Sequence, residues 1–224
     1  MIRRQRAIDL LLQLAVVVAG VTISLGLDEW RSHRADVAEA EQLAQRLRAD
    51  LVLDLEALDV STDRIGRMAA AYERLLAPDA ASLPDDSLDV YVDYAVSYVL
   101  FPPNDEAYEG MRQTGTSALL DADLRADVIR LYTQTYGRTA EWDDINRGFV
   151  LERMIPYLEA NAPETSARIE GATWIGLSTA FRALQDDVHF RNLLRTNLLF
   201  KQVQRTVYDS TTAAVRRLAP QLAE

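Results

Sequence analysis

The sequence predicts an all-α fold. The chain has 9 Gly and 7 Pro in 224 residues, whereas sheet-rich proteins have many turns that draw on both residues. Ala, Leu, Arg, Asp and Glu dominate instead, and all but Asp favour helices. Apolar residues recur at steps of three, four and seven over long stretches. We expect one N-terminal transmembrane helix that continues into a long stalk helix, packed with several further helices in an extracytoplasmic helical bundle.

The first element is an apolar run over residues 10–27, LLLQLAVVVAGVTISLGL, which has no charged side chain. As a helix it is about 27 Å long, close to the thickness of the hydrocarbon core of a bilayer. Arg3, Arg4 and Arg6 precede it and Trp30 follows it, which predicts interfacial anchors and a cytoplasmic N-terminus. We expect a single-pass protein of the bacterial inner membrane with a periplasmic C-terminal domain. A cleaved signal peptide and a buried helix of a soluble protein are the alternatives.

Small residues form a stripe through this run at Ala15, Ala19, Thr22 and Gly26. Such stripes let two membrane helices approach closely. The same seam continues outward with larger residues, through His33, Val37, Ala40, Ala44, Leu47 and Leu51. This pattern predicts a homo-oligomer that forms through the membrane helix and the stalk. The alternative is that the stalk stripe packs against later helices of the same chain.

The domain organisation follows from the helical spacing of apolar residues up to Pro78. Gly66 and Ser61–Thr62 are the positions at which the stalk could kink or break. The expected parts are a cytoplasmic stub over 1–9, a transmembrane helix over 10–27, an amphipathic stalk over 28–77, and a helical domain over 78–224 that packs with the stalk.

Four helical regions are expected within residues 78–224, from their capping residues and their Pro and Gly stops. They are a helix over about 87–101, capped by Asp86 or Ser87; a short helix from Asn104 to about Gly115; a long helix from Asp121 or Asp123, weakened at Gly137 and Gly148 and bent at Pro156; and a region from Ser178 to about 222, broken near Asp186–Asp187. Residues 161–177 are expected to be irregular.

A candidate ligand face lies on the helix expected over 87–101, where Tyr91, Tyr94 and Tyr98 share one side. Arg112 is a further candidate for lining such a site. The alternative interpretation of the tyrosines is a core stripe whose hydroxyls reach water.

The residues offer no catalytic, metal or cofactor site. The chain has no Cys, so it cannot form disulfides or thiolate sites. It has two His, and only Asp186-x-x-His189 approaches the Glu-x-x-His spacing of di-iron bundles. The net charge of −10 argues against nucleic-acid binding.

These observations favour a non-enzymatic protein-interaction or scaffolding module, with the lipid bilayer, a second copy and a possible unidentified membrane protein as partners. The alternative is a periplasmic small-molecule sensor or binding domain that acts through a membrane partner. A hydrolase with carboxylate chemistry is the third hypothesis.

Five segments of the chain carry a family resemblance: Leu27-Asp28-Glu29-Trp30, LRADLVLDLEAL, YEGMRQTG over 108–115, DADLRADVIRLYTQTY and FRALQDDVHFRNLLRTNLLF. With these the chain resembles a family of bacterial membrane-anchored proteins, domain-of-unknown-function family 6090, over nearly its whole length. The resemblance implies one N-terminal span and a helical domain, and it brings no activity, cofactor or catalytic residue. Asp28 departs from the family pattern, in which an uncharged polar residue is favoured.

Overall fold

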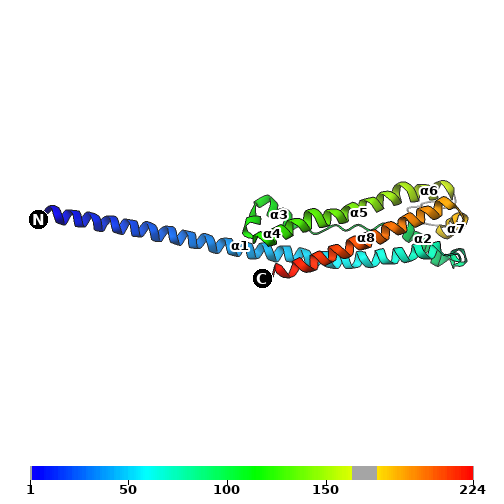
Figure 1. Cartoon of the computed structure of the whole chain (residues 1–224), viewed down its shortest axis with the longest axis horizontal. Coiled ribbons are helices and arrows are strands. Elements are labelled where there is room, and N and C mark those ends of the chain that lie inside the picture. Colours follow the sequence, from blue (N-terminus) through cyan, green and yellow to red (C-terminus); the bar gives the residue numbers. More distant parts are fainter. Residues whose placement is uncertain (1, 163–175, 224) are drawn as a thin grey trace.

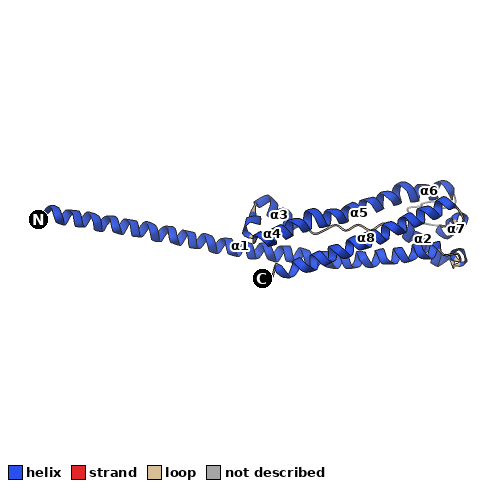
Figure 2. Cartoon of the chain, viewed as in Figure 1, coloured by secondary structure: helices blue, strands red, loops and turns tan. Residues whose placement is uncertain are grey.

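The computed structural model describes residues 2–162 and 176–223, without the side chains of residues 2–19, 21–23, 25–26 and 28. Within these ranges every regular element is helical and no strand occurs (Figure 2). This confirms the all-α fold class. The expected irregular region over 161–177 lies mostly in 163–175, outside the described residues.

The longest element is α1 (Ile2–Leu76), a single helix of 75 residues. It is helical through Ser61–Thr62 and Gly66, the positions at which it could have broken, so the stalk is one continuous helix as predicted. Figure 1 shows that its N-terminal half projects from the bundle as an isolated rod, while its C-terminal half packs alongside α8 (Val188–Gln221). Among the side chains of α1 that the structure describes, the first buried one is that of Leu43.

The third long rod of the bundle is one helical path built from five successive elements. They are α4 (Ala122–Arg130), the π-helical η3 (Leu131–Thr135), α5 (Tyr136–Phe149), the π-helical η4 (Val150–Met154) and α6 (Ile155–Asn161). Asp121 caps its start by accepting a hydrogen bond from the backbone N–H of Asp123 at 2.9 Å, as predicted.

The irregularities of this rod are π-turns rather than kinks at glycines. Gly137 and Gly148 both lie within α5 as ordinary helical residues. The second π-turn ends at Met154, two residues before Pro156, which has no N–H to donate to the preceding turn of an α-helix. The widened turn therefore lies where the α-helical hydrogen-bond pattern must break.

The helix expected over 87–101 is shorter than predicted. The observed α2 (Asp85–Ala95) begins after Pro84 and ends six residues early. Residues 97–105, called the crossing segment below, have no regular secondary structure. Figure 1 shows this segment as a thin trace that runs along the bundle between α5 and α8.

The crossing segment is not helical because buried side chains of other elements bind its backbone. Asp143 accepts a hydrogen bond from the N–H of Phe101 at 2.8 Å, and Gln204 donates to the carbonyl of Val99 at 3.3 Å. Buried backbone groups need such partners. Residues 97–101, which the apolar spacing predicted as helix, are therefore non-helical, with Val99 and Phe101 buried.

The shorter elements also differ from expectation at their starts. Asp105, not Asn104, is the residue before α3 (Glu106–Thr114), which ends at Gly115 with a φ of 75° as expected of a glycine cap. Gly176 precedes α7 (Leu177–Leu184), so Ser178 lies inside that helix. Asp187 caps α8 by accepting from Phe190 N–H at 2.7 Å, which confirms the break at 186–187. The 3-10 turns η1 (Ala80–Ser82) and η2 (Thr116–Leu119) lie in the connections.

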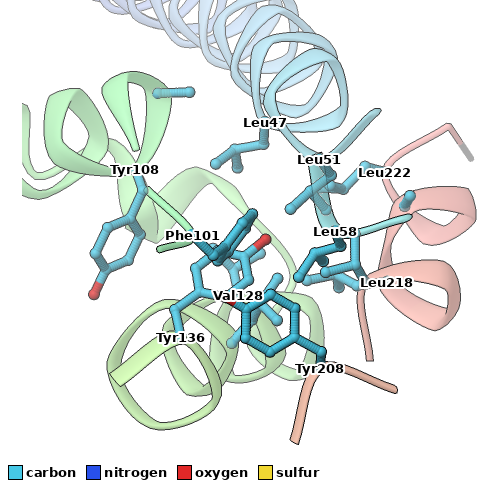
Figure 3. Close-up of a cluster of buried hydrophobic side chains, with 14 of the residues drawn as sticks. Leu47, Leu51, Leu58, Phe101, Tyr108, Val128, Tyr136, Tyr208, Leu218 and Leu222 are labelled. Atoms are coloured by element: carbon cyan, nitrogen blue, oxygen red, sulfur yellow. The ribbon is translucent and has the colours of Figure 1, made fainter. Parts of the chain in front are cut away.

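The core has two clusters, one toward each end of the bundle. The first lies at the end near α3 and α4, where Leu47 and Leu51 of α1 pack with Phe101 and Leu222 (Figure 3). The second joins α2, α6 and α7, around Tyr72, Phe181 and Phe190. Full burial of one such side chain stabilises the fold by about 1.5–3 kcal/mol. The inner end of the predicted stalk seam, at Leu47 and Leu51, is thus core of the same chain.

Candidate functional site

The structure does not describe the side chains of the predicted membrane stripe, Ala15, Ala19, Thr22 and Gly26. The side chains of the predicted anchors Arg3, Arg4 and Arg6 also lie outside the described part. Trp30 is described and is 53% exposed, with the guanidinium of Arg34 4.5 Å from its ring centre. Within the described part of the chain, no helix combines the length and the apolar character needed to cross a membrane.

The predicted ligand face does not form as one helix face. Tyr91 and Tyr94 lie on α2, but Tyr98 lies beyond its end, in the crossing segment. Tyr91 packs against the second core cluster and Tyr94 against the first. Arg112 lies on α3, paired with Glu109 at 2.7 Å. Because Tyr98 is not helical, the three tyrosines do not lie on one helix face.

A row of buried polar side chains, missed by sequence reasoning, runs along the bundle axis on α1, α5 and α8. Its members share an exposure of 3% or less and come from facing sides of the three helices: Asp54, Thr139, Asp143, Asn146, Asn197, Lys201, Gln204 and Thr211. Burial of so many polar groups is costly unless each one is hydrogen bonded.

Asp143 is the centre of this row. Its carboxylate accepts hydrogen bonds from Phe101 N–H at 2.8 Å, from Gln204 Nε2 at 2.6 Å, and from the Tyr208 hydroxyl at 2.9 Å to each oxygen. Burial raises the pKa of Asp143, while these donors and, in its protonated form, the nearby Lys201 act in the opposite direction. Every contact is a donor, which fits an ionised carboxylate.

Lys201 lies beside Asp143 and is fully buried. Its Nζ donates to Asn146 Oδ1 at 2.7 Å and to Gln204 Oε1 at 3.4 Å, both neutral amides. No salt bridge found among the described residues includes this amine. Burial lowers the pKa of Lys201 to about 7, with Asp143 opposing this change and Arg64 adding to it.

The row continues from Asn146 to the end of α2. Asn146 Nδ2 donates to Asn197 Oδ1 at 2.6 Å, and Asn197 Nδ2 donates to the hydroxyl of Tyr72. That hydroxyl donates to the carbonyl of Ala95 at 2.8 Å. Burial raises the pKa of Tyr72 far above its usual value, so the phenol is neutral. The chain of bonds thus ends on the last residue of α2.

A second carboxylate, Asp54 of α1, holds the other end of the crossing segment. Its oxygens accept from the backbone N–H and the side-chain amide of Asn104, at 2.8 and 2.9 Å, and from the Tyr136 hydroxyl at 2.5 Å. Burial raises the pKa of Asp54 against the effect of these bonds. Asp54 and Asp143 together therefore fix two backbone amides of the crossing segment.

The row clamps the crossing segment into the bundle. Its polar atoms bind each other and the crossing segment. Among the described residues, Thr62 Oγ1 is the one buried side-chain N or O without a partner. No group of three or more His, Cys, Asp and Glu that could hold a metal occurs in the described parts. His189 instead packs on the Tyr157 ring, with centres 4.8 Å apart.

An open groove lies along α5, η4, α6 and α8. It has a volume of about 460 Å³ and is lined by Phe149, Tyr157, Leu193 and Phe200, with charged groups from Glu152 and Arg153 among the remaining lining residues. Phe149 and Phe200 meet edge to face at 5.2 Å. The groove is a mostly apolar surface with a few polar groups.

Comparison with known proteins returned no match to any family model, any curated protein or any solved structure. The resemblance to family 6090 therefore stays a prediction.

Proposed function

We propose that this chain is a single-pass membrane protein whose helical bundle acts through protein contacts, without catalysis, and that it assembles as a homo-oligomer through α1. The observation that carries the proposal is the outer part of α1. Residues 29–39 are all exposed, and the helix projects past the bundle (Figure 1). Helices without packing partners are only marginally stable in water. A partner helix would stabilise this one.

The exposed apolar residues of this stretch support a second copy as that partner. Trp30 and Val37 are seven residues apart and are 53% and 45% exposed. Ala40 lies three residues further on the same side. A seven-residue repeat places such residues in the seam of two supercoiled helices. Identical chains tethered in one membrane would present this seam in parallel and in register.

The proposed tether is the apolar run over 10–27, with Arg3, Arg4 and Arg6 on the cytoplasmic side and the bundle in the periplasm. From residue 27 to Leu43, where the bundle begins, α1 extends about 24 Å at 1.5 Å per residue. The exposed rod would therefore hold the bundle away from the bilayer surface. This geometry suits a scaffold that meets other proteins at a fixed distance.

Cysteine crosslinking tests the proposal directly, because the chain has no Cys. We expect Val37→Cys to give a disulfide-linked dimer when membranes are oxidised. Ala38→Cys, its exposed neighbour outside the seam, is the matched control and should give much less. Equal crosslinking of both, or of neither, would contradict association through this seam.

A second candidate, small-molecule binding, is favoured by the groove along α5, α6 and α8. Its volume of about 460 Å³ falls in the range of ligand sites, about 300–1,000 Å³. A thermal-shift screen with small apolar acids and amines tests this function. A hit should be lost in Phe200→Ala and kept in Val188→Ala, an exposed residue at the start of α8. A compound that still raises the melting temperature of Phe200→Ala would bind elsewhere and not in this groove.

A further inference from the structure

The only lysine of the chain lies in the centre of the bundle. Lys and Arg together number 24, and every one except Lys201 is an arginine. Lys201 is also the one basic residue, among those that the structure describes, whose side chain is buried. An arginine is always charged in proteins, whereas a lysine can lose its proton when it is buried. Among the Lys and Arg side chains, the one that can become neutral therefore lies where burial favours the neutral form.

The hydrogen bonds of Lys201 match a neutral amine. A neutral amine has two N–H groups and an ammonium has three. Two acceptors lie within reach, the amide oxygens of Asn146 and Gln204. In the protonated form, the third N–H and the full charge would have no direct partner, and burial of an unpaired charge is strongly unfavourable.

Gln204 connects this amine to the crossing segment. Its Oε1 accepts from Lys201, and its Nε2 donates to the carbonyl of Val99 and to Asp143. Asp143 in turn accepts from the N–H of Phe101. The groups that surround Lys201 are thus the same groups that hold the crossing segment in the bundle.

We propose that Lys201 is a buried proton-binding site, and that proton uptake there is coupled to release of the crossing segment, residues 97–105. Release frees Gln204 and opens the amine to water, so the open form binds a proton that the closed form excludes. The protein thereby senses pH at the centre of its bundle.

The charged groups that face Lys201 come from two other helices. Asp143 of α5 favours its protonated form, and Arg64 of α1 disfavours it. Asp93 of α2 lies in the field of Arg64. The phenols of Tyr72 and Tyr208 stay neutral because burial raises their pKa values. Within the crossing segment, Asp105 at its end is the one charged side chain.

The pH window follows from the two pKa values of Lys201, about 7 in the closed bundle and 10.5 in water. Between these values the open form binds one proton more than the closed form. The opening constant therefore rises about tenfold for each pH unit of acidification. Below about pH 7 both forms are protonated and the dependence on this residue ends.

The first test is a direct titration of the full-length protein in detergent. Labelling with ¹⁵N,¹³C-lysine gives one side-chain signal, because there is one lysine. We expect its midpoint within one unit of pH 7, and a midpoint above 9 overturns the proposal. Arg64→Gln, at an exposed site, should raise the midpoint. Arg67→Gln, also exposed and paired with Asp63, is the control and should leave it unchanged.

The second test measures release by hydrogen exchange at the Phe101 amide. Its protection factor should fall about 50-fold from pH 9 to pH 7, more than at the core amides of α1, and should then level off. In Lys201→Met the fall should vanish. A wild-type protection factor that does not change with pH overturns the coupling. The same fall at every core amide also overturns it, because the opening would then be global unfolding.

Discussion

The hydroxyl of Tyr136 and the carboxylate of Asp54 are hydrogen bonded across the bundle at 2.5 Å, although 82 residues separate them in the sequence. The same carboxylate binds Asn104 at the end of the crossing segment. This one side chain therefore ties together α1, α5 and a backbone that has no secondary structure of its own.

Removal of the Tyr136 hydroxyl tests the strength of this connection. We expect Tyr136→Phe to lower the free energy of unfolding by about 1–3 kcal/mol, because a buried carboxylate loses a donor. Urea denaturation would measure the change. Tyr98→Phe is the control, since no hydrogen bond of the Tyr98 hydroxyl is observed, and its effect should stay within about 0.5 kcal/mol. Equal effects would mean that the bond contributes nothing.

Asp54 should also leave a signature in the pH dependence of stability. Its folded pKa is raised above the ordinary value of 3.8, so the folded protein binds more protons than the unfolded chain just above that value. Its contribution to stability is therefore lost as the pH rises from 3.8 through the folded pKa. The difference in unfolding free energy between wild type and Asp54→Asn, followed by denaturation at several pH values, should show this slope. A slope of opposite sign would indicate a lowered pKa.

Two substitutions on α1, one at a buried leucine and one at an exposed valine, test where the helix joins the core. Leu47 is fully buried, and Leu47→Ala should cost about 2–5 kcal/mol of stability. Val52 lies five residues on and is 46% exposed, so Val52→Ala should cost less than about 0.5 kcal/mol. Thermal denaturation compares the two. Small effects from both would place Leu47 in the free rod instead of the core.

The proposed tether predicts a loss of membrane attachment when a charge enters the apolar run. Val17→Arg should disfavour insertion by about 2.5–3.5 kcal/mol, since a charge at the centre of a membrane helix is costly. Val17→Leu keeps the run apolar and should change nothing. Extraction of cell membranes with alkaline carbonate is the measurement. Wild-type protein that washes off as readily as Val17→Arg would be inconsistent with a spanning helix.

The sequence predicted the helical rods well, because their boundaries are local. The cap at Asp121, the glycine end at Gly115 and the break at 186–187 each depend on a few neighbouring residues, and each is observed. The crossing segment was missed because its conformation depends on distant side chains. Asp143 and Gln204 bind it from 42 and 105 residues away.

The buried polar row did leave a signal in the sequence. On α8 the members Asn197, Lys201, Gln204 and Thr211, together with Tyr208, which donates to Asp143, lie at steps of four, three, four and three. On α5 the members Thr139, Asp143 and Asn146 lie at steps of four and three. Polar residues at the spacing of a core stripe are unusual, because burial must be compensated by hydrogen bonds. That spacing could have identified the row, whereas its pairing across helices could not be read from one sequence.

The most direct test of the central claim, self-association through the outer part of α1, is the mass of the full-length protein in detergent by analytical ultracentrifugation. We predict at least twice the mass of one chain, reduced to the mass of one chain by Val37→Glu in the seam and unaffected by Ala38→Glu outside it. A wild-type protein that sediments as a single chain at all accessible concentrations would contradict the account.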